Sequence, residues 1–309
     1  MPINHAQAAT RGRLWLGLLV LYIVWGSTYL AIRVSLETMP ALVSCGLRFV
    51  LAGLLVLTVL TVLGRVGPPP GWTEIRGSAI AGTWIIIGGV GVVTITEVHA
   101  PSNLTAVLAS TTSLWVVGYR ALGGERISRG AILGAAIGIV GVFVLLSPGG
   151  SGADNPWLIL AIVAALFWST GSFYGRRLTQ PADPFVGAVV QMIVAGSIML
   201  VAGVAIDGLD ALDPTVPSAR SWLALAYLAV AGAAAFSAYI WALKHLPIST
   251  VVSHQYVNPA VAVFLGAIVL DESLGVSAVI GAALVIAAVF ATVRSDAKPA
   301  AVAEELVAD

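Results

Sequence analysis

Long apolar runs separated by short polar segments cover almost the whole 309-residue chain. A helix needs about 20 residues to cross the roughly 30 Å hydrocarbon core of a bilayer. We therefore predict ten membrane-spanning helices, at residues 14–34, 40–63, 78–98, 101–121, 129–147, 156–176, 184–205, 219–243, 247–270 and 274–294. The first run is too long for the core of a signal peptide and lacks a small-residue cleavage site, so we expect it to remain as the first span.

The breaks between these runs are rich in residues that end helices. Proline, glycine and charged residues cluster at residues 37–40, 65–76, 123–126, 176–184, 207–220 and 271–272. Two other breaks, at 99–101 and 244–247, are very short, and in each of them a proline opens the next run. Because proline is tolerated in the first turn of a helix but not further inside it, these two breaks predict tight helical hairpins.

A polar seam at residues 148–156 divides the chain into halves that resemble each other. Trp25 and Trp168 each precede a short run of Gly, Ser and Thr, and Ala52-Gly recurs as Ala195-Gly. Both pairs are 143 residues apart (168 minus 25, and 195 minus 52). This ordered spacing is typical of an internal duplication. We predict an N-terminal five-helix repeat at 1–147, a linker at 148–156, a second repeat at 157–295 and a tail at 296–309.

Composition and charge agree with a membrane protein and predict its orientation. Hydrophobic residues make up 59% of the chain and charged residues 10%, with a mean hydropathy of +0.98, outside the range of soluble domains. Because cytoplasmic loops retain Lys and Arg, we place both termini in the cytoplasm. Twelve of the 15 basic residues then lie on the cytoplasmic side, two (Arg33 and Arg220) on the outer side and one (Arg48) within a span.

Five spans per half is an odd number, so the second half enters the membrane from the opposite side. Inverted repeats related by a pseudo-two-fold axis are the architecture of many secondary transporters, which bind their substrate near the midplane between the repeats. The predicted fold is therefore an all-α integral membrane protein, with ten transmembrane helices arranged as two inverted five-helix repeats.

One helix face in each half combines a tryptophan with hydroxyl groups. Helical spacing puts Trp25, Thr28 and Tyr29 on one face of the first span. The corresponding face of the sixth span carries Trp168 and Ser172. Aromatic surface for contact and hydroxyls for orientation are typical of a small-molecule pocket. The alternative is that both tryptophans are interfacial anchors, although both fall near the middle of their spans.

Two ionisable residues within the spans are candidates because charge inside a membrane is costly. Arg48 lies in the middle of the second span, where it either contacts substrate or clamps backbone carbonyls or an acid. Gln191 occupies its place in the second half. Glu97 ends the third span after Thr94-Ile-Thr96. It is either a carboxylate that exchanges protons during transport or a solvated helix end.

The ninth predicted span is the most polar of the ten. His254, Tyr256 and Asn258 follow one another closely and occupy several faces, so protein or water and not lipid should surround this helix. Pro259 removes a backbone hydrogen bond, a common way to bend a helix beside a transported ligand. His254 is either an interhelical hydrogen-bonding group or a proton carrier.

The sequence argues against several other classes of protein. Basic and acidic residues are equal in number, at 15 each, and no basic stripe is interleaved with aromatics, which disfavours a nucleic acid partner. The single Cys45 allows no intramolecular disulfide, and the four histidines lack ligand spacing, so we expect no metal and no cofactor. No P-loop pattern is present, so direct ATP coupling would need another subunit.

Six motifs stand in order along the chain: Trp25-Gly-Ser-Thr-Tyr-Leu-Ala-Ile-Arg33, Gly46-Leu-Arg-Phe49, Thr94-Ile-Thr-Glu97, Gly124-Glu-Arg126, Gln255-Tyr-Val-Asn-Pro259 and Asp271-Glu-Ser-Leu274. Together they resemble the drug/metabolite transporter superfamily, in its ten-span EamA branch, over roughly residues 14–294. The resemblance implies an inner-membrane carrier of small organic solutes, often an exporter of amino acids or other metabolites.

The same resemblance implies a cavity bounded by spans 1, 3, 4, 6, 8 and 9. Glu97, Tyr256 and Asn258 match family motif positions. Ser113 stands where similar sequences commonly have proline, while Pro259 is retained at the equivalent place in span 9. This departure leaves open whether the two halves bend alike.

Two functions fit the sequence. The first is an alternating-access secondary transporter of the bacterial inner membrane, an exporter of small metabolites such as amino acids or drug-like compounds, with proton coupling as an option. It would work as a monomer or weak homodimer. Its candidate substrate-binding residues are Trp25, Thr28, Tyr29, Arg48, Glu97, Trp168, Ser172, Gln191, His254, Tyr256 and Asn258. The second is an integral-membrane enzyme or lipid-handling protein, but the nearest acid pair, Asp271 and Glu272, is adjacent in sequence and lies on different helix faces.

Overall fold

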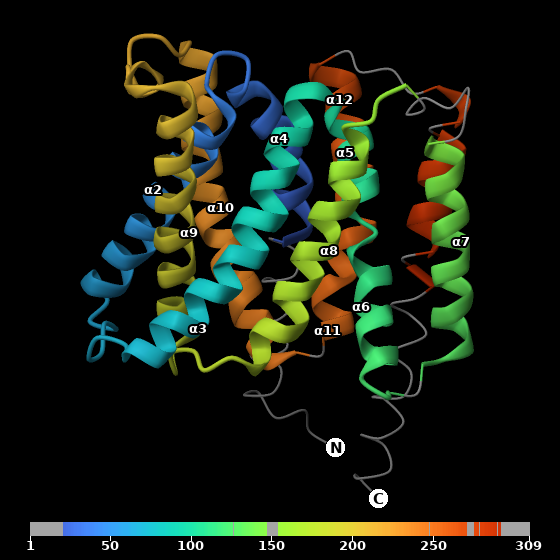
Figure 1. Cartoon of the computed structure of the whole chain (residues 1–309), viewed down its shortest axis with the longest axis horizontal. Helices are drawn as coiled ribbons and strands as arrows, with labels where there is room; N and C mark the ends of the chain where they lie inside the picture. Colours follow the sequence, from blue (N-terminus) through green and yellow to red (C-terminus); the bar gives the residue numbers. More distant parts are fainter. Residues whose placement is uncertain are drawn as a thin grey trace, which may run out of the picture.

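The computed structural model describes residues 21–125, 127–146, 154–246, 248–270, 275–277, 279–288 and 290–291, with the side chains of 145, 146, 249, 250, 253 and 256 outside this description. All regular elements in these ranges are helical (Figure 1). They are residues 21–35, α2 (Ala41–Val62), α3 (Trp72–Gly82), the π-helix η1 (Thr83–Gly91), α4 (Val92–His99), α5 (Ser102–Ala109), α6 (Thr112–Leu122), α7 (Arg129–Leu146), α8 (Leu158–Tyr174), α9 (Pro184–Asp207), α10 (Ala219–His245), α11 (Ile248–Val251), α12 (Asn258–Val269), residues 279–288, and the 3-10 helices η2 (Gly175–Arg177), η3 (Leu209–Leu212) and η4 (Val252–Tyr256).

These elements cross the bundle ten times in alternating directions. The passes are 21–35, α2, α3 with η1 and α4, α5 with α6, α7, α8 with η2, α9, α10, α11 with η4 and α12, and 279–288. Residues 21–35 open the first half and α8 opens the second, and these two passes run in opposite directions (Figure 1). The prediction of an all-helical protein with duplicated, inverted halves is therefore confirmed.

Helix length and composition agree with a membrane protein. Five helical stretches are each long and apolar enough to cross a bilayer, namely Ala41–Val62, Trp72–His99, Leu158–Arg177, Pro184–Asp207 and Ala219–His245. The fourth and ninth passes are built from shorter helices joined in the middle. Their interruptions concern the site and are described below.

Helices end where the sequence supplies suitable chemistry. Pro40 precedes α2, and Gly64 follows it with a φ of 62°, a left-handed conformation that glycine adopts without strain. The Asp183 carboxylate caps α9 by accepting a hydrogen bond from the Phe185 N–H at 2.8 Å. The predicted breaks at 37–40, 99–101, 176–184 and 207–220 are confirmed. The predicted breaks at 123–126 and 244–247 each include a residue, 126 or 247, that lies outside the described residues. The predicted break at 271–272 lies outside the described residues.

The predicted break at 65–76 is too long. The helix begins at Trp72, six residues before the predicted start of the third span at 78. The Glu74 carboxylate accepts a hydrogen bond from the Gly71 N–H at 2.8 Å, which satisfies an end group of the helix and starts it in a polar stretch. The apolar pattern did not predict this first helical turn, because a capping hydrogen bond and not a buried apolar face stabilises it.

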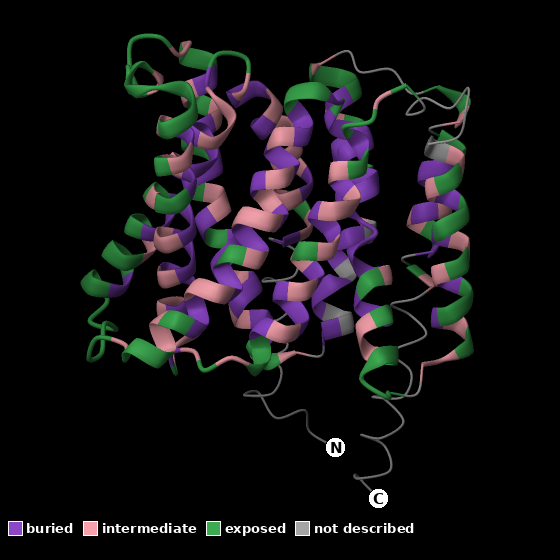
Figure 2. Cartoon of the chain, in the orientation of Figure 1, coloured by how far each residue is buried: buried purple, intermediate pink, exposed green. Residues whose placement is uncertain are grey.

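Polarity is distributed in the reverse of a soluble protein. Exposed residues lie mainly on the outer faces of the bundle (Figure 2), and many of them are large and apolar, such as Leu54, Val62, Leu133, Phe143, Val201, Leu223 and Phe264. Many interior side chains are polar, among them Arg48, Thr94, Glu97, Asn103, Ser172, Gln191, His254 and Asn258. An apolar exterior suits contact with lipid chains, and a polar interior suits a path for solutes.

α2 and α9 hold the two halves together by close backbone contact. A Cβ atom added to Gly46 would lie 2.4 Å from the backbone nitrogen of Leu200, and one added to Gly196 would lie 2.9 Å from the backbone nitrogen of Val50. Small residues allow such an approach between helices in a membrane, where no hydrophobic effect drives them together. α2 and α9 are the second passes of their halves, so this contact crosses the interface between the repeats.

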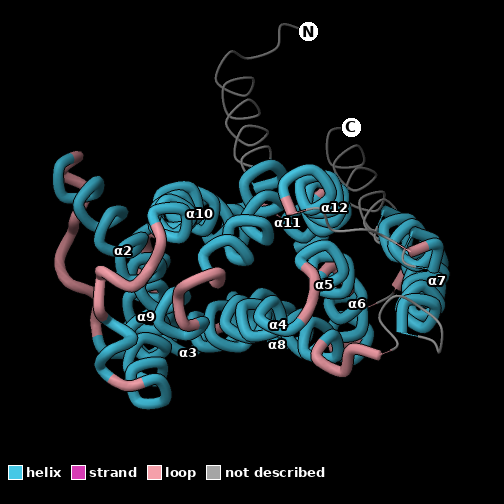
Figure 3. Tube along the Cα trace, turned by 90° about the horizontal axis from the view of Figure 1, so that it is seen from above, coloured by secondary structure: helices cyan, strands magenta, loops and turns pink. Residues whose placement is uncertain are grey.

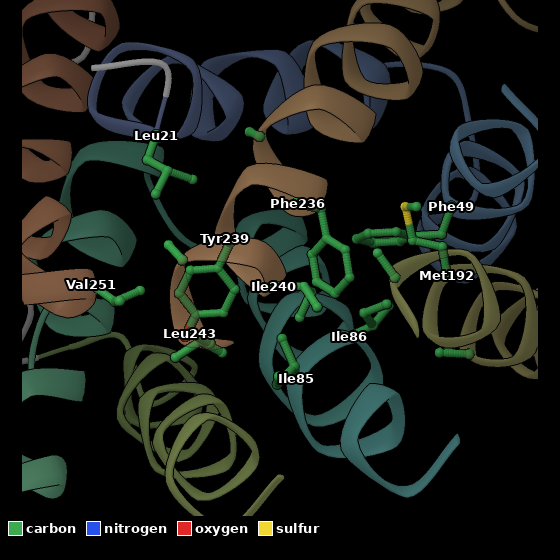
Figure 4. Close-up of a cluster of buried hydrophobic side chains, with 14 of the residues drawn as sticks. Leu21, Phe49, Ile85, Ile86, Met192, Phe236, Tyr239, Ile240, Leu243 and Val251 are labelled. Carbon is green, nitrogen blue, oxygen red and sulfur yellow. The ribbon is translucent and has the colours of Figure 1, made fainter. Parts of the chain in front are cut away.

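Seen along the passes, the bundle is elongated (Figure 3). α2 and α9 lie at one end and α7 at the other, with α10 and α12 along one side and α3, α4, α8 and α6 along the opposite side. The largest apolar cluster includes Phe49, Met192, Phe236, Tyr239 and Leu243 (Figure 4). These residues come from α2, α9 and α10, so this core too is shared between the halves.

Candidate functional site

A cavity lies between the two halves. Its lining comes from residues 21–35, α2, η1, α4, α5, α6, α8, α10, η4 and α12. All six spans implied by the family resemblance therefore contribute, and α2, the second span, contributes as well. The cavity has a volume of about 80 Å³, and about 780 Å³ of space free of protein atoms lies in the cavity and its open mouth together. This space suits a compact solute, with the open mouth as its route of entry.

Most of the predicted site residues meet at this cavity. Seven of the eleven line it: Trp25, Thr28, Tyr29, Arg48, Trp168, His254 and Asn258. Ser172 and Glu97 are fully buried but do not line it, and Gln191 lies in a separate hollow. The side chain of Tyr256 lies outside the described part of the chain.

Four rings from both halves cluster at the cavity, and three of them, Trp25, Trp168 and His254, line it. The indole of Trp25 makes an edge contact with that of Trp168, with ring centroids 5.1 Å apart. It also contacts Tyr239 and His254, each at 4.8 Å between centroids. The Trp168 indole N–H donates a hydrogen bond to the Tyr239 hydroxyl at 2.8 Å, and that hydroxyl also bonds the Ser172 hydroxyl. This cluster of Trp25, Trp168, Tyr239 and His254, the aromatic cluster, links four passes.

The family resemblance implied that the eighth span, α10, bounds the cavity, but sequence reasoning identified none of its residues. Leu228, Gly232 and Phe236 line the cavity at intervals of four residues, and Tyr239 completes the aromatic cluster one turn further on. Such spacing puts residues on one helix face, so the signal was present in the sequence. It was overlooked because this face carries no charge and no repeated motif.

Arg48 reaches the cavity from α2 with only 6% of its surface exposed. Its guanidinium carbon lies 4.8 Å from the centroid of the neighbouring Phe49 ring. Its Nε atom is buried without a hydrogen-bond acceptor, and among the described residues no carboxylate lies within ion-pair distance of it. The structural clamp considered from the sequence would require such an acceptor.

The fourth and ninth passes are interrupted at equivalent depths beside the cavity. Between α5 and α6, Ser110 and Thr111 form a turn, and the Ser110 hydroxyl donates to the Val107 carbonyl at 2.6 Å. In the ninth pass, η4 separates α11 from α12. Pro259 explains the second interruption, whereas hydroxyl groups that bond back to the backbone accompany the first. Both halves are thus interrupted even though only one retains the proline.

The start of α12 offers polar groups to the cavity. The His254 Nδ1 atom donates to the Val251 carbonyl at 2.8 Å, since a carbonyl can only accept. The His254 Nε2, Gln255 Oε1 and Asn258 Oδ1 atoms are buried without a hydrogen-bond partner in the described part of the protein. Buried polar groups are normally satisfied, so these three are candidates for contact with a ligand or with water.

A second hollow of about 830 Å³, open space included, lies at the end of the bundle that carries Arg65, Arg120, Arg176 and Lys244. We call this end the basic end. The Gln191 amide donates to the Gln180 amide oxygen at 3.0 Å at the edge of this hollow. Gln191 is therefore separated from the cavity that its counterpart Arg48 lines.

Glu97 lies near the opposite end of the bundle, in α4. Its side chain is fully buried, and its backbone carbonyl accepts a hydrogen bond from the Arg33 guanidinium. The solvated helix end considered from the sequence does not match this burial. Within the described ranges, no group of three or more His, Cys, Asp or Glu could hold a metal ion.

Two inverted halves around a ligand-sized cavity, with an apolar exterior, define a membrane transporter. The model of the EamA-like transporter family matches residues 12–147 and 155–294, and the chain belongs to this family. The family is one of transporters and not of enzymes. The chain is accordingly a multi-pass protein of the inner membrane that handles a small-molecule substrate.

Individual relatives agree with this membership. The chain is 36% identical over 253 residues to the inner membrane transporter YedA of Escherichia coli, covering 81% of this chain and 80% of that one. It is 24% identical over 287 residues to a probable amino-acid metabolite efflux pump of Salmonella typhimurium, covering 89% and 93%. A solved crystal structure matches this chain with a TM-score of 0.65 and 20% sequence identity. The match covers 91% of this chain and 97% of the solved chain, and it shows a likeness of fold alone.

Proposed function

We propose that this protein is a secondary-active transporter that exports small organic metabolites, amino acids among them, by alternating access. The observation that carries the proposal is the cavity between the halves, where Trp25 of the first half meets Trp168 of the second. The similarity to a probable amino-acid metabolite efflux pump supports the direction and the solute class.

The second hollow supports alternating access because some of its lining residues are the counterparts, in the second repeat, of residues that line the cavity. Its residues Gly171, Gly175 and Gln191 each lie 143 positions after a cavity residue: Thr28, Ile32 and Arg48 (171 minus 28, 175 minus 32, 191 minus 48). In a protein with inverted repeats, the two halves exchange conformations between the two access states. The hollow would then mark where the cavity opens toward the basic end.

Apolar clusters lie on both sides of the cavity along the passes. Toward the basic end, Tyr239, Ile240 and Leu243 belong to the large core (Figure 4). Toward the opposite end, Ile32 and Leu228 belong to a smaller cluster. In the proposed cycle, rocking of one half against the other opens one cluster while the other stays closed.

We further propose that the basic end faces the cytoplasm, with both termini on that side. Basic residues are concentrated at this end, as expected for cytoplasmic loops. Tags fused to residues 1 and 309 would then be digested by protease only in inverted membrane vesicles. Digestion of either tag in intact spheroplasts would contradict this orientation.

The transport function is tested with purified full-length protein in proteoliposomes. Vesicles loaded with an unlabelled amino acid should accumulate the labelled one by counterflow, which needs no energy source. A panel of neutral, acidic and basic amino acids covers the proposed class. Protein-free vesicles are the control, and the absence of counterflow for the whole panel would overturn the proposal.

Proton coupling in this proposal is assigned to Glu97. A fully buried carboxylate in a membrane pass is retained at a cost that a functional role explains. Glu97→Gln keeps the shape of the side chain but cannot exchange a proton. We expect the variant to lose the acceleration of flux by an imposed pH gradient while it retains counterflow without a gradient.

Glu37→Gln serves as the matched control for Glu97→Gln. Glu37 lies near the same end but is exposed and pairs loosely with Arg220 at 3.5 Å. Its variant should respond to the pH gradient like the original protein. An undiminished response in Glu97→Gln would exclude Glu97 as the proton-exchanging group.

A further inference from the structure

In the described part of the chain, the cavity is lined by one charged side chain and by no opposite charge. Among the described lining residues, Arg48 is the only Lys, Arg, Asp or Glu. A guanidinium this deeply buried has lost most of its hydration, and burial of a charge is favourable only when an opposite charge or hydrogen-bond acceptors replace the water. Neither acts on Arg48 in the part of the chain that the structure describes. Since no described residue supplies this acceptor, we take it to come from water or from a ligand.

The surroundings of Arg48 restrict what that ligand can be. The rest of the lining is largely apolar and aromatic, with Trp25, Trp168 and Phe236 among its largest members. Such surface favours an apolar body, and the unpartnered Gln255 Oε1 and Asn258 Oδ1 atoms of the lining can accept hydrogen bonds from an amino group. The small volume of the cavity, about 80 Å³, favours a compact molecule.

We infer that Arg48 binds the carboxylate of the transported solute, and that this solute is a small acid with an uncharged, largely apolar side chain, such as a neutral amino acid. This inference rests on the proposed transport function and adds the group that the cavity recognises. The planar guanidinium can form a bidentate pair of hydrogen bonds with a carboxylate. Such a pair is both stronger and more directional than a neutral hydrogen bond.

The inference explains why the two halves differ at this position. Gln191, 143 residues after Arg48, finds its own partner in Gln180 and does not reach the cavity. A single positive charge on one wall fixes the solute in one orientation, with its carboxylate toward α2 and its body toward the tryptophans. Amines without a carboxylate would meet an unbalanced cation and bind poorly.

The test compares acids with their amides, because an amide keeps the body and the amino group but lacks the carboxylate. The probes are L-leucine with L-leucinamide and L-phenylalanine with L-phenylalaninamide, titrated into purified full-length protein in detergent by calorimetry. Of the two acids, we compare the one that binds the original protein more tightly with its amide. Its dissociation constant should be lower than that of the amide by a factor of roughly ten or more.

Variants then assign this preference to Arg48. In Arg48→Gln, the acid and its amide should bind within about twofold of each other. Arg48→Lys keeps the charge and should keep a reduced preference for the acid. Arg65→Gln is the matched control: Arg65 follows the same helix, but it is half-exposed, pairs with Asp183 and does not line the cavity. It should behave like the original protein.

Three results would overturn the inference: equal binding of acid and amide by the original protein, an unchanged preference in Arg48→Gln, or failure of both acids to bind. If Arg48→Gln does not fold, the inference is judged from the ratio of the amide and acid dissociation constants in the original protein and in Arg48→Lys. Acid-selective binding without counterflow would instead refute transport and leave the carboxylate site standing. Counterflow of amides as fast as acids would refute the carboxylate site and leave transport standing.

Discussion

Gly46→Ala is expected to lower sharply the yield and the melting temperature of the folded protein. The added Cβ would lie 2.4 Å from the Leu200 backbone nitrogen and 2.8 Å from the Gly196 carbonyl oxygen. Both are backbone atoms of α9, so no side chain can rotate out of the way and the helices must separate. Overpacking typically lowers the free energy of unfolding by about 1–3 kcal/mol. Because rigid backbone lies on both sides of Gly46, we expect a loss of roughly 3 kcal/mol.

Gly118→Ala provides the control for this prediction. Gly118 also lies inside a helix, α6, but no atom lies within 4 Å of the position of an added Cβ. Alanine is favoured over glycine in helices by about 1 kcal/mol, so this variant should be unchanged or slightly more stable. Size-exclusion chromatography and thermal melting in detergent compare the two. Equal stability of both variants would contradict the close contact between α2 and α9.

The passes and their inversion could be predicted because a bilayer imposes strict physical limits. Length and hydropathy define a span almost independently of its neighbours, and an odd number of spans per half inverts the second half. The helix start at Trp72 escaped prediction because a Glu74 cap defines it. The π-helix η1 also escaped, since nothing in the apolar run 83–91 distinguishes it from an α-helix.

The site was predictable to the extent that chemistry stands out against an apolar background. Trp25 and Trp168 recur at the 143-residue spacing of the repeat, Arg48 is charged inside a span, and all three line the cavity. Gln191 was inferred by analogy with Arg48, but the cavity is not symmetric, and its counterpart in the second half is a separate hollow. Tyr239 was missed because its importance comes from the rings around it and not from its own helix.

Trp168→Ala is expected to reduce counterflow on the order of a hundredfold while the protein still folds. Truncation removes the edge contact with Trp25 at 5.1 Å and the hydrogen bond to Tyr239 at 2.8 Å. Loss of a large, partly buried aromatic ring lowers the free energy of unfolding by about 3 kcal/mol. The remaining contacts between α2 and α9 should keep the halves assembled, so the main deficit should be in binding and transport.

Two further variants separate the role of Trp168 in the cavity from its role in packing. Trp168→Phe keeps a ring in the cavity wall but loses the hydrogen bond, worth about 1 kcal/mol, and should retain much of the transport. Trp115→Ala removes a tryptophan that is 37% exposed and does not line the cavity, so it should transport normally. Counterflow rates normalised to folded protein give the comparison. If Trp168→Ala transports at the original rate, the tryptophan pair only packs the halves together, and the substrate path must lie elsewhere in the bundle.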